Sequence, residues 1–411
     1  MGFIVVIILT FVLIFLVQFY FVKKVYRSIL RTFPKLSIGT FKNVLRVLII
    51  FLDLYPLFLL AAFIFLSSST GQARPYIPDE WYINYFLLYP FWLWVFLVVQ
   101  CVLLFFIIEI IKLIILPIYR QHKEKMKNIE AKIVIVILIF FVIYVPARVI
   151  FDYYTVSTRV VEYKKSDLPD DLNNFRITFI SDIQADAYTD ASRLGKYIDR
   201  VNEINPDLVL IGGDMITSTP DYIDEAAEYV GKIKSKYGVY SCIGDHDNWA
   251  YRNDYSRSLK EVEDAMKKYN VEMFNNKDTV LNIKNSKIGI TFLTSTYVEH
   301  LKMETISHFV HKQPGANLNI LLIHQPNADA VRNAADAGYD LFLAGHTHGG
   351  QVTFLFPFIN LTPTLLETRF TRGDFHLGNM LMIVTRGLGM SLVPMRYNST
   401  PEITVIVLKK S

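Results

Sequence analysis

The sequence predicts two parts, a membrane-embedded helical region and a layered α/β domain. Hydrophobic residues make up 52% of the 411 residues, more than a water-soluble globule needs. This excess is concentrated before residue 151. From about residue 152, short apolar runs alternate with amphipathic segments, which is typical of an α/β domain. We therefore expect a transmembrane domain over 1–151 and an α/β domain over 152–411.

Four apolar segments near the N-terminus have the length of membrane-spanning helices. They are residues 3–22, 45–66, 86–108 and 133–150. The first is followed by lysine and arginine rather than by a small-residue cleavage site, so we expect a retained anchor and not a signal peptide. Asp53 lies inside the second segment and is a candidate functional residue, although pairing within the helical bundle explains it equally well.

Basic residues are concentrated in the first and third loops between these segments. They are Lys23, Lys24, Arg27, Arg31, Lys35, Lys42 and Arg46 in the first loop, and Arg120, Lys123, Lys125, Lys127 and Lys132 in the third. The second loop contains only Arg74. Because cytoplasmic loops carry the excess of lysine and arginine, we expect both termini and all of 152–411 to lie outside the cytoplasm. These loops account for most of the formal net charge of +4, so the charge predicts no nucleic-acid partner.

Each of five predicted strands in the second domain ends in an acidic or imidazole side chain. The strands end at Asp182, at Asp214, at Asp245-His246-Asp247, at His324, and at His346 with His348. Open α/β sheets bind ligands at the carboxyl ends of their strands. A single aspartate there is usually a turn or capping residue, but five such endings together favour a metal centre at the sheet edge.

The ordered motifs resemble the signature of the calcineurin-like metallophosphoesterase superfamily. They are Asp182-Ile-Gln184, Gly213-Asp214, Gly244-Asp245-His246-Asp247, His324 and Gly345-His346-Thr347-His348. The resemblance extends from about residue 174 to the end of the chain, and 345–351 and 384–408 are similar to a membrane-anchored bacterial branch. It implies an α/β two-sheet sandwich, the calcineurin-like metallophosphoesterase fold. The segment 279–293 predicts one of its hairpins, around an Asn-Ser turn.

The resemblance implies a site with two divalent metal ions and the hydrolysis of a phosphoric ester. Asp214 would bridge the ions, with Asp182, Gln184 and His348 completing one, and Asp245, His324 and His346 completing the other. His246 would act at the leaving-group oxygen, with Asp247 orienting its ring. Arg372, Arg386 and Arg396 are candidates for a phosphate clamp, with purely structural roles as the alternative.

Two ligand positions depart from the family pattern. Gln184 stands where the family usually has histidine, and Asp245 stands where it usually has asparagine. The site thereby loses one nitrogen ligand and gains oxygen character, which favours manganese or magnesium over iron or zinc. Asp186, two residues further along, is a candidate for the missing ligand. The alternative is a degraded site that binds one ion or none.

The predicted membrane anchor makes a membrane lipid or a lipid-linked phosphate the first choice of substrate and partner. The apolar segment 354–366 directly follows the metal-binding loop and would rest on the bilayer or line an acyl groove, unless it packs back on the sheet. One alternative is a phosphohydrolase for soluble extracytoplasmic phosphoesters. Another is a catalytically weak sensor or assembly protein. We expect a multi-pass protein of the bacterial cytoplasmic membrane, whose oligomeric state the sequence does not indicate.

Overall fold

The computed structural model describes residues 2–36, 38–70, 80–251, 254–311 and 313–411. The chain forms two compact units. The helical unit comprises Met1–Ile150 and the inserted segment Phe354–Leu361, and the sandwich unit comprises Phe151–Thr353 and Thr362–Ser411. The predicted domains, 1–151 and 152–411, differ from these units in one respect, because they place 354–361 in the α/β domain.

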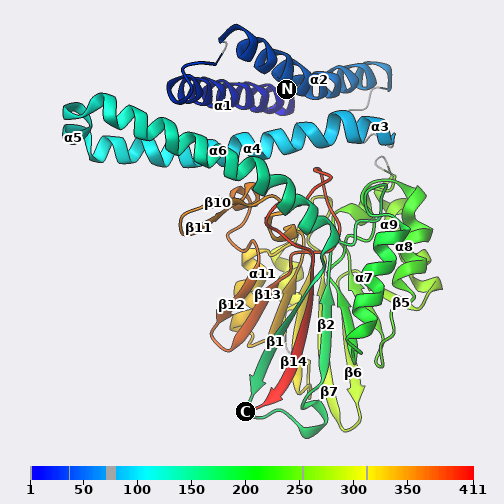
Figure 1. Ribbon diagram of the computed structural model, residues 1–411. Helices are drawn as coiled ribbons and strands as arrows, with labels where there is room; N and C mark the ends of the chain where they lie inside the picture. The colour runs from blue at the N-terminus through cyan, green and yellow to red at the C-terminus, as the bar shows by residue number, and fades with distance from the viewer. Residues whose placement is uncertain (1, 37, 71–79, 252–253, 312) are drawn as a thin grey trace. The chain divides into compact units, whose positions relative to one another are not determined.

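The helices of the helical unit cover all of the predicted apolar segments (Figure 1). They are α1 (Gly2–Thr32), α2 (Ile38–Thr70), α3 (Trp81–Ile83), which continues through 84–88 into α4 (Tyr89–Ile114), α5 (Leu116–Gln121) and α6 (Lys123–Tyr154). Among the described residues, two helical runs are long and apolar enough to cross a membrane, Trp81–Ile114 and Lys123–Tyr154. The expected total of four spans stays a prediction. Arg74, which contributes to the predicted orientation, lies outside the described residues.

Asp53 is paired inside the helical bundle. Gln18 Nε2 donates to both Asp53 carboxylate oxygens, at 3.3 and 3.1 Å, and the Trp94 indole donates to Gln18 Oε1 at 3.1 Å. One chain of hydrogen bonds thereby joins α1, α2 and α4. Polar groups in an apolar bundle need such partners. These contacts support the pairing alternative for Asp53.

The sandwich unit contains two six-stranded sheets, which confirms the expected two-sheet architecture (Figure 1). In spatial order, the first sheet is β1 (Ser157–Lys165), β14 (Glu402–Lys410), β2 (Arg176–Ile180), β3 (Leu208–Ile211), β4 (Val239–Cys242) and β5 (Val271–Phe274). The second is β12 (Gly373–Leu377), β13 (Met380–Val384), β9 (Leu341–Ala344), β8 (Leu318–Ile323), β7 (Ser286–Leu293) and β6 (Lys277–Ile283). The helices are α7 (Ala191–Glu203), α8 (Ile223–Val230), α9 (Tyr255–Lys268), α10 (Met303–Phe309) and α11 (Ala328–Asp336).

Side-chain alternation along each strand divides the apolar residues between two cores. In β2, Ile177 and Phe179 pack between the sheets, while Ile180 packs with the helices α7, α8 and α9. In β8, Leu322 packs between the sheets, while Ile323 packs with α11. Because both faces of these central strands are covered, their sequences are continuously apolar.

The hairpin predicted over 279–293 is present as β6 and β7, with one correction. Ile283 pairs with Ser286, so the two-residue turn is Lys284-Asn285 and not Asn-Ser. Lys284 has a φ of 53°, a conformation that tight two-residue hairpin turns require.

The segment 354–361 forms a short antiparallel hairpin, β10 (Phe354–Phe356) and β11 (Ile359–Leu361), that packs on α4. Gln100, fully buried within α4, pairs with the hairpin as a neighbouring strand would. Its Nε2 donates to the Leu355 carbonyl at 2.9 Å, and the Leu355 amide donates to its Oε1 at 2.8 Å. The Phe354 ring meets the Phe96 ring edge to face one helical turn away. This part of 354–366 therefore packs on a helical run that is apolar enough to cross a membrane.

The inter-sheet core gives a testable difference between two positions. Leu322 is fully buried, so Leu322→Ala should lower the free energy of unfolding by about 2–5 kcal/mol. Val280 on β6 is 38% exposed, and Val280→Ala should change it by roughly 0.5 kcal/mol. Calorimetric unfolding of the detergent-solubilised full chain measures both effects. Equal effects would contradict the core position of Leu322.

Candidate metal centre

The predicted metal ligands come from adjacent strands of both sheets. Asp182, Asp214 and Asp245 follow β2, β3 and β4, and His324 and His346 follow β8 and β9. Their ligand atoms form two groups, Asp182–Asp214–His324 and Asp245–His324–His346, in each of which all atoms lie within 4.8 Å of one another. The strand order therefore assembles these side chains at one end of the sandwich.

Asp245 is the centre of the second group. Its Oδ2 lies 2.8 Å from His346 Nδ1 and 3.3 Å from His324 Nε2. Gln325 Nε2 donates to both Asp245 oxygens at 3.0 Å, and the Tyr297 backbone amide donates to Oδ1 at 2.6 Å. These two donors offset part of the negative charge that aspartate adds at this position. No motif in the sequence indicates either of them.

The environment of His324 fits a divalent cation. His324 Nδ1 donates to the Gly212 carbonyl at 2.6 Å, which leaves the Nε2 lone pair facing the site. Nε2 is buried without a hydrogen-bond partner and lies 3.3 Å from the carboxylates of both Asp214 and Asp245. Against the lowering effect of burial, these carboxylates raise the pKa of His324 well above its usual value. The position therefore attracts a positive charge, which a metal ion supplies.

His346 is oriented by a carboxylate that no motif indicates. Glu367 Oε1 lies 2.8 Å from His346 Nε2, so Nδ1 is the ring atom that faces Asp245. The Tyr297 hydroxyl also donates to Glu367. Burial opposes protonation of His346, but Asp245 and Glu367 raise its pKa to about 9. A carboxylate on the outer nitrogen of a ligand histidine fixes the ring and increases its basicity.

Asp214 connects the two groups. Its Oδ2 lies 3.3 Å from His324 Nε2 and accepts a hydrogen bond from Gln184 Nε2 at 2.9 Å. Its Oδ1 accepts from the backbone amide of His246 at 2.8 Å. Burial alone would raise the pKa of Asp214, but His324 and His246 lower it to about 2. Asp214 is therefore a carboxylate at neutral pH, as a bridging ligand must be.

Gln184 and His348 are the two remaining ligands that the resemblance implies, and Gln184 turns a hydrogen-bond donor toward the site. Gln184 directs its amide nitrogen at Asp214, and its Oε1 lies 3.3 Å from the Thr217 hydroxyl oxygen. His348 Nδ1 lies 3.3 Å from Arg396 Nη2, and its Nε2 lies 3.6 Å from Asp182 Oδ1 and 3.5 Å from Gln184 Nε2. Because a metal ion binds the oxygen of an amide and not its nitrogen, metal binding by Gln184 requires a rotation of its amide group.

The backbone at the site is strained. Five predicted ligands have φ between 49° and 70°, the left-handed region that side chains disfavour: Asp182, Gln184, Asp214, His346 and His348. Such residues cost about 1–3 kcal/mol each and persist where the surrounding structure holds them. Neighbouring glycines make room for them, since a Cβ at Gly244 would overlap the Asp214 carboxylate and one at Gly345 would overlap the Ser181 side chain.

The structure corrects the predicted role of Asp247. Its carboxylate accepts from the backbone amides of Asp214, Met215 and Gly244 at 2.8–3.0 Å, rather than orienting the His246 ring. Burial and the nearby Asp214 charge raise the pKa of Asp247 to about 6. Asp247 therefore holds together the loops that carry the metal ligands.

The His246 ring is instead held by a backbone carbonyl. His246 Nδ1 donates to the Thr217 carbonyl, and Ser391 Oγ lies 3.3 Å from Nε2. The ring also packs edge-on against Trp249, at 4.6 Å between ring centroids. Thr217 belongs to none of the quoted motifs, whereas Ser391 lies in 384–408, the segment similar to a membrane-anchored bacterial branch.

The guanidinium groups of all three candidate phosphate-clamp arginines have partners within the protein. Arg396 is buried and donates to the carbonyls of Gly389, His348, Arg386 and Ser399. Arg386 forms an ion pair with Glu402 at 2.7 Å, and Arg372 donates to the Asn398 carbonyl at 2.9 Å. These contacts support the structural alternative for Arg386 and Arg396, and the phosphate clamp stays a prediction.

Asp186 does not lie in either group of ligand atoms. Its Oδ1 accepts from the backbone amides of Tyr188 and Thr189 at 2.8 Å, and its Oδ2 accepts from the Thr217 hydroxyl at 2.8 Å. It therefore stabilises a turn. Thr217 connects this turn to Gln184, so Asp186 affects the site through hydrogen bonds rather than as a ligand.

The position of Glu367 leads to a test by metal affinity. Glu367→Gln removes the charge that holds His346 and should weaken manganese binding about 10–100-fold. Glu304→Gln, an exposed glutamate on α10, is the matched control and should leave the affinity unchanged. Calorimetric titration of the metal-stripped full chain measures both. Equal affinities in the two variants would remove the assigned role of Glu367.

Comparisons with known proteins agree with this geometry. Residues 175–350 match the family described as Calcineurin-like phosphoesterase. An uncharacterized metallophosphoesterase of Bacillus subtilis is 30% identical over 262 residues, which are 63% of this chain and 87% of that protein. A Danio rerio protein named "Transmembrane protein with metallophosphoesterase domain" is 29% identical over 266 residues, 61% of this chain and 57% of that protein.

A third relative also covers the helical part of the chain. An uncharacterized metallophosphoesterase of Campylobacter jejuni is 25% identical over 397 residues, 93% of this chain and 97% of that protein. The matched family, these relatives and the Asp/His groups at the strand ends lead to one conclusion: the chain belongs to the calcineurin-like phosphoesterase family and is a metallophosphoesterase.

Proposed function

We propose that this metallophosphoesterase hydrolyses a phosphoester or pyrophosphate of a membrane lipid or of a lipid-linked substrate. The observation that carries the proposal is the path of the chain after the metal-binding loop. The chain leaves the sandwich unit after Thr353, forms the hairpin 354–361 on α4, and re-enters the sandwich unit at Thr362. Because α4 lies in a helix apolar enough to cross a membrane, this path ties the loop of His346 and His348 to a membrane element.

The proposed location follows from the same reasoning. Four N-terminal helices would span a bacterial cytoplasmic membrane, with the sandwich unit outside the cytoplasm. The distribution of basic residues between the loops supports this orientation. A relative named as a transmembrane protein supports membrane attachment. Membrane lipids are then both the surroundings and the partners of the protein.

The residues around the site have separable tasks in the proposed reaction. When bound, divalent ions would polarise the phosphoryl group and lower the pKa of an attacking water. Asp182, Asp214, Asp245, His324 and His346 would hold the ions. The Thr217 carbonyl fixes the Nδ1 proton of His246, so Nε2 is the atom that exchanges a proton with the leaving-group oxygen.

An aromatic wall beside the ligands provides an apolar contact for the rest of the substrate. The rings of Trp249 and Tyr297 are parallel, with centroids 6.2 Å apart, and the Tyr297 ring lies 5.6 Å from that of His346. Tyr297 is 51% exposed, so a substrate reaches it from solvent. The glycerol or acyl part of a lipid would pack on such a surface.

Manganese or magnesium is the proposed metal, because the buried carboxylates of Asp182, Asp214 and Asp245 favour hard cations. Hydrolysis of an aryl phosphodiester and an aryl phosphomonoester by the full chain, stripped and titrated with manganese, magnesium, zinc or iron, tests this. His246→Ala should lower kcat by about 10²–10⁴-fold. Asp214→Asn should abolish the metal-dependent turnover, because it removes the carboxylate between the two proposed ions. His308→Ala, an exposed histidine on α10, is the control. Absence of turnover and of metal binding would instead favour a sensor or assembly protein.

The contact between Gln100 and the hairpin tests the lipid substrate. Gln100→Ala removes both hydrogen bonds to Leu355 and should lower hydrolysis of phospholipids in vesicles several-fold, with the soluble aryl phosphodiester hydrolysed as before. Gln18→Ala, which removes the partner of Asp53 elsewhere in the helical unit, is the matched control. An equal loss for both substrates would contradict a hairpin role in lipid use. Full activity of wild type on soluble esters alone would favour the soluble-substrate alternative.

A further inference from the structure

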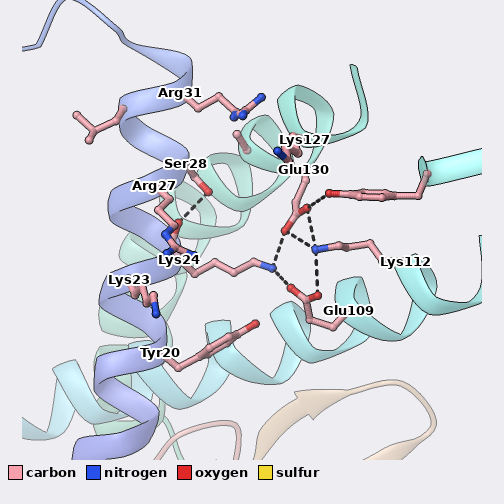
Figure 2. A pocket seen from close by; sticks show the side chains of 13 residues that line it. Tyr20, Lys23, Lys24, Arg27, Ser28, Arg31, Glu109, Lys112, Lys127 and Glu130 are labelled. Carbon is pink, nitrogen blue, oxygen red and sulfur yellow. Dashed lines mark hydrogen bonds and ion pairs between the residues drawn. The ribbon is translucent and has the colours of Figure 1, made fainter. Parts of the chain in front are cut away.

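We propose that the helical unit contains a second ligand site, a cationic pocket that binds the phosphate group of an anionic ligand. The pocket lies between α1, the end of α4 and the start of α6 and has a volume of about 660 Å³ (Figure 2). Known small-molecule sites span roughly 300–1,000 Å³. The pocket lies wholly within the helical unit, so the proposal does not rest on the metal centre or its proposed substrate.

Ion pairs between three helices stabilise one side of the pocket. Lys24 of α1 contacts Glu109 of α4 and lies 2.7 Å from Glu130 of α6. Lys112 of α4 lies 3.0 Å from both glutamates, so that two ammonium groups alternate with two carboxylates (Figure 2). The Lys24 side chain is only 9% exposed. The two lysines and two glutamates have no net charge together, so they connect the helices and leave the charge of the other cations in the pocket unbalanced.

Four further cations line the pocket and leave it positively charged. Arg31 and Lys127 share the Glu124 carboxylate, each at 3.0 Å. Lys23 and Arg27 also line the pocket (Figure 2). Within the described part of the chain, no carboxylate forms an ion pair with Lys23 or Arg27. The surplus of positive charge therefore remains even when Glu124 is counted.

The helical period explains how the sequence of α1 produces this surface. Tyr20, Lys24, Arg27 and Arg31 recur at intervals of three or four residues, so their side chains lie on one face of the helix. Like charges on one helical face repel one another. Placing Arg27 and Arg31 together is therefore unfavourable in the empty pocket and becomes favourable when an anion lies between the cations.

The chemistry of the lining indicates phosphate rather than a simple halide. Guanidinium groups donate paired hydrogen bonds that match phosphate oxygens, and lysine adds a point charge. Tyr20, Leu30 and Ala131 add an apolar and aromatic part to the same lining. Basic clusters next to membrane helices attract anionic lipids by about 1 kcal/mol for each lysine or arginine. Both a lipid head group and a soluble phosphate ester carry the required group, and experiment can separate them.

Binding to the full-length protein in detergent tests the proposal. The probes are short-chain phosphatidylglycerol, the zwitterionic short-chain phosphatidylcholine, glycerol 1-phosphate and inorganic phosphate, titrated in chelator with native mass spectrometry as readout. Wild type should bind at least one anionic probe more tightly than phosphatidylcholine. Lys23→Gln with Arg27→Gln should weaken that binding about tenfold or more, because two charged donors are lost.

A matched pair of variants controls for general loss of charge. Arg120→Gln with Lys125→Gln removes two exposed cations that do not line the pocket and should leave the affinity unchanged. Unchanged hydrolysis of a soluble aryl phosphodiester would show that both double variants are folded. Preference for phosphatidylglycerol assigns the site to a lipid head group, and preference for glycerol 1-phosphate or phosphate assigns it to a soluble anion. Equal binding of all probes, or equal loss in the two double variants, would overturn the proposal.

Discussion

The burial of three carboxylates at one end of the sandwich unit is the constraint on which the rest of the site depends. Asp182, Asp214 and Asp245 are at most 1% exposed, and like charges in a poorly solvated position repel strongly. The structure meets this constraint with opposing groups, chiefly the imidazoles of His324 and His346. A divalent cation compensates more of this negative charge than a single proton does, because it carries two positive charges. The left-handed backbone at several ligands is maintained because the two sheets hold the strand ends together.

Asp247 shows how a buried charge can support a site without entering it. Its carboxylate binds backbone amides of the loops after β3 and β4, and so fixes Asp214 and Asp245 relative to each other. From sequence, an aspartate beside a catalytic histidine looks like the partner of that histidine. Only the three-dimensional direction of the side chain separates the two roles. The same holds for Arg396, whose surrounding carbonyl groups no sequence pattern specifies.

The parts of the site that sequence could predict are those where a local pattern and a strand ending coincide. Asp182, Asp214, His324 and the His346 motif all follow apolar strands, so strand order alone brings them together. Glu367, Tyr297 and Gln325 come from irregular segments, and their contribution depends on loop conformations. The two-sheet architecture was implied by the resemblance of the ordered motifs to the calcineurin-like family, whereas the alternation of apolar runs and amphipathic segments predicted only a layered α/β domain. The hairpin on α4 was not, because its pairing partner is a single glutamine within a long apolar helix.

The segment 346–367 brings these features together. It begins with His346, continues through His348, enters the helical unit as the hairpin on α4, and returns with Glu367, which is hydrogen-bonded to the ring of His346. Both ends of the excursion therefore meet at one imidazole. The ring of His346 is held within the sandwich unit, by Asp245 at Nδ1 and by Glu367 at Nε2, whereas the hairpin is held by Gln100 within the helical unit. Because the two sets of hydrogen bonds share no residue, loss of the hairpin contact leaves both partners of this metal ligand in place.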